Sequence, residues 1–253
     1  MGALIELKGV TNRFGRQVVH DSVNLTLNEN ETLGIVGGSG SGKSVLLRTM
    51  LGLNRPQEGT VKVEGADLYA RSDDERLDIQ KKWGVLFQNG ALFSGLSVLD
   101  NVALPLREHT DLAPKAVEDL AFLKLKMVGL KDEAADKRPS ELSGGMVTRA
   151  GMARAMALDP DILFLDEPTG ALDPVAANAL DELMQSLREV MKLSILIITH
   201  DPNTLVKVCD RIAMIVDKKV EAGTLDEMLK SKNPKIREYF HSPRVQTAIS
   251  ERQ

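Results

Sequence analysis

The eight residues from Gly37 to Ser44, GGSGSGKS, constrain the fold of this chain more than any other segment. They fit the pattern G-x-x-x-x-G-K-[ST] and lie between an apolar strand pattern, TLGIVG, and an apolar helix pattern, VLLRTMLGL. In that context glycines let backbone amides wrap phosphate oxygens, the lysine reaches the terminal phosphates, and the last hydroxyl ligates Mg²⁺. The sequence therefore predicts a phosphate-binding loop made of Gly37, Gly38, Ser39, Gly40, Ser41, Gly42, Lys43 and Ser44.

The rest of the chain has the strand and helix patterns that such a loop requires. Residues 3 to about 70 contain short strand patterns separated by Gly and Asn turns, and residues 72 to 158 carry helix patterns. Beyond them, DILFLDE and SILIITH resemble buried strands, and the segment Pro174 to Lys192 between them resembles a crossover helix. These patterns predict an α/β nucleotide-binding fold with an inserted helical region.

Composition excludes several classes of protein. The chain has 253 residues, 43% of them apolar, so it can bury a large core. A net charge of −4 without long basic runs makes nucleic acid an unsuitable partner, and the one cysteine, Cys209, permits no internal disulfide. No apolar run approaches the length of a membrane span or of a signal core, so we expect a cytosolic location.

Three polar side chains at strand ends are candidates for catalysis. In ILFLDEP, Asp166 and Glu167 end an apolar strand pattern, where Asp166 would complete the Mg²⁺ shell and Glu167 would orient or deprotonate the attacking water. His200 ends SILIITH, at the edge of a parallel sheet where ligands bind, and we expect it to contact the γ-phosphate. Without the phosphate loop, each would be read as an ordinary loop residue.

Two further residues have two interpretations each. Gln88, in VLFQNGALF, is expected to close another apolar strand, where its amide could contact the metal or the attacking water, although a plain loop glutamine fits the pattern as well. Phe14 could stack on adenine, or it could be a small-core aromatic residue.

A second helix start also has the chemistry of an anion site. Ser143 is a natural N-cap, and Gly144 and Gly145 behind it expose backbone amides at the positive end of a helix. Asp173 before Pro174 is an N-cap and first-turn pair, which does not exclude a second role. No lysine accompanies Gly144 and Gly145, so the sequence alone leaves open whose phosphate this second site would bind.

With these motifs in order, the chain resembles the ATP-binding subunit of ABC transporters from residue 3 to about residue 230, followed by a tail over residues 231 to 253. The resemblance implies a P-loop NTPase fold of the ABC type, with an N-terminal antiparallel β subdomain and an α-helical subdomain inserted at about residues 90 to 158. It implies ATP and Mg²⁺ as ligands, with Ser44, Gln88 and Asp166 around the metal and Glu167, His200 and Gln88 in catalysis. Phe14 takes the adenine-stacking position, and Val45 stands where a threonine often occurs.

The same resemblance implies a head-to-tail homodimer, and this would explain the second anion site. Residues Leu142 to Met146 match the family's signature motif, so Ser143, Gly144 and Gly145 of one subunit would contact the γ-phosphate bound by the other. Gly170 to Asp173 match the D-loop at that dimer interface. Met146 replaces the usual glutamine, which puts a polar contact from that side chain in doubt.

A narrower likeness rests on LFQNGALFSGLSVLDNVALPLREHT and PSELSGGM. These stretches resemble the ATPase subunit of Mla-type phospholipid transport systems, which maintain outer-membrane lipid asymmetry. The likeness implies a position on the cytoplasmic side of the bacterial inner membrane, bound to permease subunits, with a substrate-binding envelope protein and a STAS-domain subunit as further partners. The apolar residues between Leu86 and Val98 would form the permease contact, or they would fill the chain's own helical subdomain.

The rival interpretations are a transporter ATPase for another substrate, a soluble ABC ATPase of the iron-sulfur assembly type, a DNA-repair or chromosome-type ATPase, and a nucleotide-binding subunit without catalysis. The DNA-repair type needs long insertions that the sequence lacks, and Glu167 with His200 argues against a non-catalytic subunit. The tail from Ser231 carries Tyr239 and Phe240 in a possible helix. It would contact a neighbouring subunit, or it would be a frayed terminus.

Overall fold

The computed structural model describes residues 2 to 252, and these form two units. The residues up to Leu77 fold together with those from Ser194 onward, and the second unit runs from Asp78 to Leu193. Helix α2 (Asp73–Gln80) crosses the boundary between them. Each unit is described separately below.

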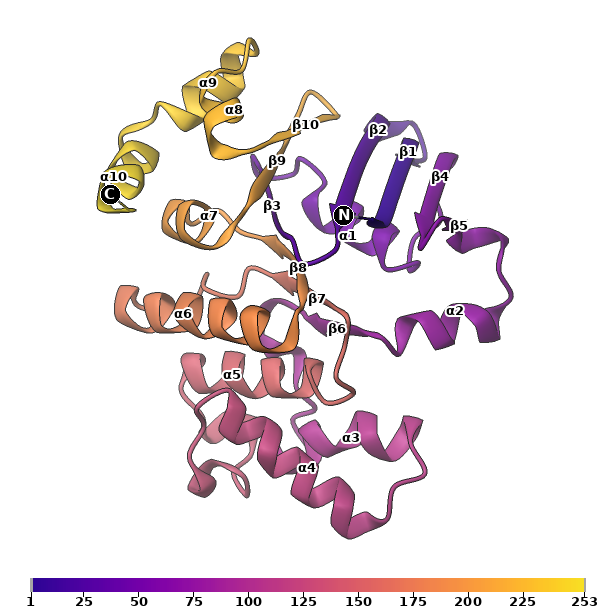
Figure 1. Cartoon of the computed structure of the whole chain (residues 1–253), viewed down its shortest axis with the longest axis vertical. Coiled ribbons are helices and arrows are strands. Elements are labelled where there is room, and N and C mark those ends of the chain that lie inside the picture. Colours follow the sequence, from indigo (N-terminus) through magenta and orange to yellow (C-terminus); the bar gives the residue numbers. More distant parts are fainter. Residues whose placement is uncertain (1, 253) are drawn as a thin grey trace. The chain divides into compact units, whose positions relative to one another are not determined.

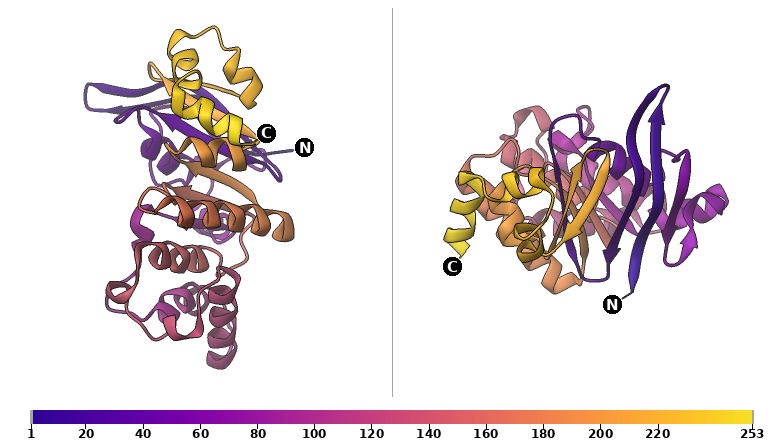
Figure 2. Two further views of the ribbon diagram at one scale, coloured as in Figure 1. Left: turned by 90° about the vertical axis from the view of Figure 1, so that its left-hand side faces the viewer. Right: turned by 90° about the horizontal axis from the view of Figure 1, so that it is seen from above.

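The first unit begins with an antiparallel sheet in the strand order β2-β1-β4-β5. Its strands are β1 (Ala3–Phe14), β2 (Gln17–Asn28), β4 (Glu58–Val63) and β5 (Ala66–Asp67). Strands β1 and β2 form the long hairpin drawn in indigo (Figure 2). Ile5, Leu7 and Val61 are buried on one face, as the period of two in their strands requires. The structure therefore confirms the antiparallel sheet expected near the N-terminus.

A second, mixed sheet of the first unit carries the phosphate loop. Strand β3 (Thr32–Gly37) pairs in parallel with β8 (Ser194–Ile198) on one side and β9 (Arg211–Val216) on the other. Strand β10 (Lys219–Gly223) pairs antiparallel with β9. Helices α1 (Lys43–Met50) and α7 (Pro202–Val208) follow β3 and β8. Parallel pairing puts the carboxyl ends of β3 and β8 at one edge of the sheet.

The C-terminal tail is helical. It continues from α8 (Leu225–Leu229) into α9 (Pro234–Phe240) and α10 (Pro243–Arg252). Ile236, Phe240, Val245 and Ala248 are buried, and α10 packs against α7 of the same unit. The helix expected around Tyr239 and Phe240 is confirmed, and a contact with a neighbouring subunit stays a prediction.

The second unit combines a strand pair with a group of helices (Figure 1). Strands β6 (Trp83–Leu86) and β7 (Ile162–Asp166) are parallel neighbours. The helices are α3 (Val98–His109), α4 (Pro114–Met127), α5 (Gly144–Ala155) and α6 (Pro174–Met191), of which α3, α4 and α5 pack on one another. Short 3₁₀ turns are η1 (Leu68–Ala70) in the first unit, and η2 (Gln88–Ala91), η3 (Asp132–Ala134) and η4 (Pro139–Glu141) in the second.

Within the part of the chain that the structure describes, no helix is long and apolar enough to cross a membrane. The same residues include no group of three or more His, Cys, Asp or Glu side chains placed to hold a metal ion. Cys209 is buried.

Candidate functional site

The phosphate loop of the first unit has the geometry of an anion-binding turn. Gly42 is the N-cap of α1 in a left-handed conformation with φ of 99°, and its residue type offers no side-chain cap to the first amides of the helix. A Cβ at Gly38 or at Gly40 would meet no atom within 4 Å, so a ligand can reach this backbone. Residues Ser39 to Gly42 thus leave the positive end of α1 open to phosphate oxygens.

The side chains of this loop are placed to support that chemistry. Lys43 Nζ donates to the carbonyl oxygens of Gly37 and Gly38 at 2.8 and 3.3 Å, so the ammonium group lies over the loop. Ser44 is exposed at the start of α1, and Val45 is half-buried beside it. A loop of this form, with an exposed hydroxyl after the lysine, fits a triphosphate and its Mg²⁺ ion.

Two other candidates, Phe14 and His200, also belong to the first unit. Phe14, at the end of β1, is 51% exposed, so it is not the small-core aromatic residue of the alternative interpretation. His200 is exposed two residues after the end of β8, which pairs in parallel with the strand that leads into the phosphate loop. Both positions agree with contact to a bound nucleotide.

The second unit brings the signature residues beside the segment expected to be the D-loop. Ser143 caps α5 through a 3.4 Å hydrogen bond from the amide of Met146, as an N-cap should. A Cβ on Gly144 would lie 3.6 Å from the carbonyl oxygen of Ala171, and one on Gly145 would lie 3.6 Å from Leu172. The exposed start of α5 and the D-loop therefore form one continuous surface.

The acidic pair lies at the end of β7 in the same unit. Asp166 and Glu167 are half-buried, and Glu167 has a positive φ of 53°, which is costly for a residue with a long side chain. The amide of Gly170 donates to the Glu167 carbonyl oxygen at 3.2 Å and closes the turn. Asp173 then caps α6, accepting from the amides of Val175 and Ala176 at 3.0 Å each. The positive φ of Glu167 is backbone strain of the kind found at functional positions.

Gln88 lies in a turn rather than at the end of a strand. Strand β6 ends at Leu86, and Gln88 opens the turn η2 with an exposed side chain. Asn89, Gly90 and Ala91 then take three consecutive positive φ values of 60°, 73° and 47°. The expectation that Gln88 closes a strand was wrong in this detail, because left-handed residues cannot continue a β ladder.

Helix α5 holds this turn tightly. A Cβ on Gly151 would lie 3.0 Å from Gly90 Cα and 2.7 Å from Leu86, so only glycine allows the approach. Arg154, also on α5, donates to the carbonyl oxygens of Ala91 and Gly90 at 2.8 and 3.0 Å. Burial lowers the pKa of Arg154, but an arginine stays charged at physiological pH. The turn of Gln88 is thus fastened to the helix that begins with the signature glycines.

An apolar hollow of about 430 Å³ lies next to this turn. Phe87, Phe93, Leu104 and Pro105 provide much of its wall, and Arg154 also borders it. Of the loop's apolar residues, Leu86 and Val98 are buried, whereas Phe93 is 55% exposed. Leu86 and Val98 thus fill the chain's own core, as one interpretation of residues 86 to 98 expected. Phe93 remains on the surface, and a contact with a permease stays a prediction.

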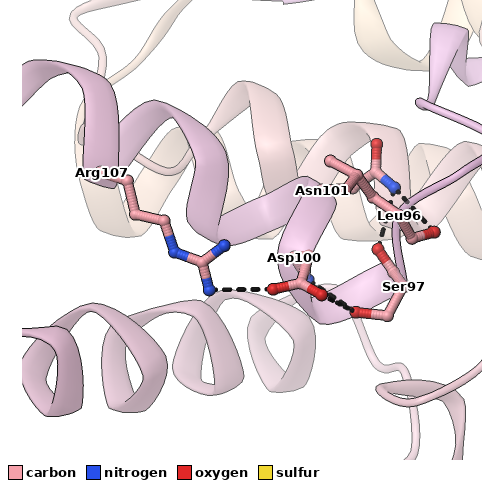
Figure 3. Close-up of polar contacts among 5 residues, drawn as sticks. All are labelled: Leu96, Ser97, Asp100, Asn101 and Arg107. Carbon is pink, nitrogen blue, oxygen red and sulfur yellow. Dashed lines mark hydrogen bonds and ion pairs between the residues drawn. The ribbon is translucent and has the colours of Figure 1, made fainter.

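Polar contacts hold the start of α3, where Asn101, Asp100 and Ser97 lie close together (Figure 3). Asn101 also holds the backbone at Phe93. Buried Asn101 accepts from the Phe93 amide at 2.7 Å and donates to the carbonyl oxygens of Phe93 and Ser97 at 3.1 and 2.9 Å. Asp100 accepts from the Ser97 hydroxyl and from Arg107, and these two hydrogen bonds hold the pKa of its carboxyl below the usual range. Asn101 has no local sequence signal of its own, although Ser97 and Asp100 have the spacing of a helix N-terminus.

Comparisons with known proteins agree with this arrangement. The sequence matches the family described as "ABC transporter" over residues 20–170. It is 38% identical over 238 residues to the intermembrane phospholipid transport system ATP-binding protein MlaF of Haemophilus influenzae, covering 94% of this chain and 90% of that one. It is 39% identical over 246 residues to the probable ribonucleotide transport ATP-binding protein mkl of Mycobacterium leprae, covering 97% of this chain and 71% of that one.

Among solved structures, the fold matches a dimeric post-hydrolysis state of the ATP-binding cassette MJ0796 bound to ADP and Pi. The TM-score is 0.80 at 32% identity, and the match covers 87% of this chain and 98% of that chain. The fold and the phosphate loop define a P-loop ATPase. This chain belongs to the ABC transporter family, as an ATP-binding domain. It is an ATPase whose hydrolysis of ATP is coupled to transport, and ATPases of this family act as dimers with membrane permeases.

Proposed function

We propose that this chain is the ATPase of a phospholipid transporter that moves lipid between the inner and outer membranes of a Gram-negative bacterium. The similarity to MlaF over 94% of the chain supports this proposal. The observation that carries it is the apolar hollow beside Phe93, since an exposed aromatic side chain whose backbone is held by Asn101 suits a permease helix. The chain would bind there from the cytoplasmic side, with an envelope lipid-binding protein and a STAS-domain subunit in the same complex.

In the proposed reaction, the first unit binds the nucleotide. Phe14 stacks on the base, the amides of Gly38 to Ser44 surround the phosphates, and Lys43 neutralises their charge. Ser44, Asp166 and Gln88 would hold a Mg²⁺ ion, which offsets negative charge on the phosphates during transfer. Glu167 orients the attacking water and accepts its proton, and His200 donates to the γ-phosphate.

The proposed assembly is a head-to-tail homodimer. Ser143, Gly144 and Gly145 form an amide-lined helix start without a lysine, which suits a phosphate bound by another chain. Asp173 and its neighbours lie beside these glycines, so the D-loop would contact the partner at the same interface. ATP then closes the dimer because it contacts both chains only in the closed state.

The coupling to the permease would pass through the turn of Gln88. This turn borders the hollow and is fastened to α5 by Arg154 and by the close approach of Gly151. A permease helix that occupies the hollow therefore contacts a segment that moves with the signature glycines.

The experiment that tests this function starts from full-length tagged protein purified from membranes in mild detergent. We expect a permease to accompany the parent protein, and Phe93→Asp to lose it while keeping nucleotide binding. The reconstituted complex should move labelled phospholipid between vesicles only with hydrolysable ATP. Transport of ribonucleotides instead would favour the activity printed in the name of the mycobacterial relative, and recovery of soluble scaffold proteins alone would contradict the proposal.

A further inference from the structure

A buried histidine lies directly behind the phosphate loop. His20, on β2, has no exposed surface, and its Nε2 atom has no hydrogen-bond partner. A Cβ on Gly42 would lie 2.7 Å from this Nε2 and 2.5 Å from Val19, so the imidazole edge touches the Gly42 backbone. A leucine could fill the same buried space and would leave no polar atom without a hydrogen bond. Packing alone therefore does not explain why a histidine lies against the phosphate loop.

The hydrogen bonds around His20 determine which nitrogen carries the proton. Asn12 Nδ2 lies 3.0 Å from His20 Nδ1 across the β1–β2 pair. Asn12 Oδ1 accepts from Asn54 Nδ2 at 3.2 Å, so its amide nitrogen faces the histidine. Nδ1 therefore accepts a hydrogen bond. Burial lowers the pKa of His20 to about 4, so the ring is neutral and its proton is on Nε2.

The same polar network holds both ends of α1. Its N-cap, Gly42, rests against His20, and Thr49 in its last turn accepts from Asn54 Nδ2, which also donates to Asn12. Tyr69 extends the network, because its hydroxyl donates to the Asn54 carbonyl oxygen at 2.7 Å and lies 3.0 Å from that of Thr49. Asn12 thus links the position of α1, with Lys43 and Ser44 at its start, to the sheet that carries Phe14.

We propose that His20 is a positioning residue for nucleotide binding, which backs the left-handed Gly42 and presents its Nε2–H to the phosphate loop. This role rests on the proposed assignment of residues 37 to 44 as the nucleotide site. The N–H dipole adds to the positive potential of the α1 amides, and the ring keeps the loop open to phosphate oxygens. Residue 20 thereby sets how tightly the chain holds nucleotide without touching it.

The test compares two variants of the full-length protein by titration with Mg-ADP. His20→Leu keeps the packing volume and removes the donor, whereas His20→Gln places an amide donor near the position of Nε2. We expect the dissociation constant to rise about 5- to 20-fold for His20→Leu and to stay within about threefold for His20→Gln. Both melting temperatures should stay close enough to the parent's for the proteins to be folded during the titration. Equal affinity of parent and His20→Leu, or equal loss in both variants, would overturn the proposal.

Two controls separate this proposal from the site assignment beneath it. Lys43→Ala should abolish binding, and unchanged binding in that variant would reject residues 37 to 44 as the nucleotide site, whatever the His20 variants do. If neither His20 variant folds, the ¹⁵N spectrum of histidine-labelled parent protein decides. It should show a neutral Nε2–H ring for His20 whose signal shifts on addition of Mg-ADP. A charged ring, an Nδ1–H ring or an unchanged signal would reject the proposal.

Discussion

The buried His20 makes the stability of this protein depend on pH in a defined direction. Its pKa is about 4 in the folded chain, compared with 6.5 for the ordinary imidazole, because burial disfavours the charged form. The unfolded chain therefore binds a proton that the folded chain does not, and the free energy of unfolding falls as pH drops below 6.5. Between about pH 7.5 and about pH 5, the titration of His20 alone should lower the free energy of unfolding by about 2 kcal/mol.

The assay is urea denaturation of the parent protein and of His20→Leu at a series of pH values. Carboxylates such as Asp100, whose pKa is also lowered, contribute in both proteins, so the difference between the two curves isolates His20. We expect the free energy of unfolding of the parent, relative to that of His20→Leu, to fall by about 2 kcal/mol over that pH range. Parallel curves would show that His20 titrates normally, and they would refute its placement as a buried neutral ring.

Three further predictions concern the second unit. Glu167→Gln should lower ATP hydrolysis by about 100-fold or more while keeping nucleotide binding, as a phosphate-release assay beside a binding titration can show. Arg154→Ala should lower the free energy of unfolding by about 2 to 3 kcal/mol, because two carbonyl oxygens lose charged donors. Thermal unfolding measures this loss, and a clearly smaller one would contradict the role given to Arg154. Gly151→Ala should cost about 1 to 3 kcal/mol through its clash with Leu86, whereas Gly95→Ala, where a Cβ meets nothing within 4 Å, should leave the unfolding midpoint unchanged.

Those parts of the fold with strong local signals could be predicted from the sequence. Strand β3 occupies Thr32–Gly37 as its apolar run indicated, and α6 begins at Pro174 behind the Asp173 cap. Ser143 caps α5 as its position before two glycines suggested. In each case the signal is contained in a few adjacent residues, since caps and buried strands depend mainly on their own neighbours.

The remaining features depend on contacts between distant residues. Strand β10 has a half-exposed, charged sequence and exists because it pairs with β9. The turn after Gln88 takes left-handed conformations at non-glycine residues because Arg154 holds it, and that partner is more than sixty positions away. His20 resembled one of several scattered histidines, and only its contact with Gly42 reveals its environment. Contacts between residues so far apart in the sequence cannot be recognised from a local sequence pattern.

The central claim is that each chain supplies the signature glycines that complete the phosphate site of its partner. Ser39 and Ser143 are both exposed and Cys209 is buried, so a Ser39→Cys chain and a Ser143→Cys chain, each with Glu167→Gln, carry one accessible thiol apiece. Mixed with Mg-ATP under mild oxidation, they should form a disulfide-linked dimer containing one chain of each kind, and far less of it without nucleotide. Absence of that mixed dimer while both variants bind ATP would contradict the claim.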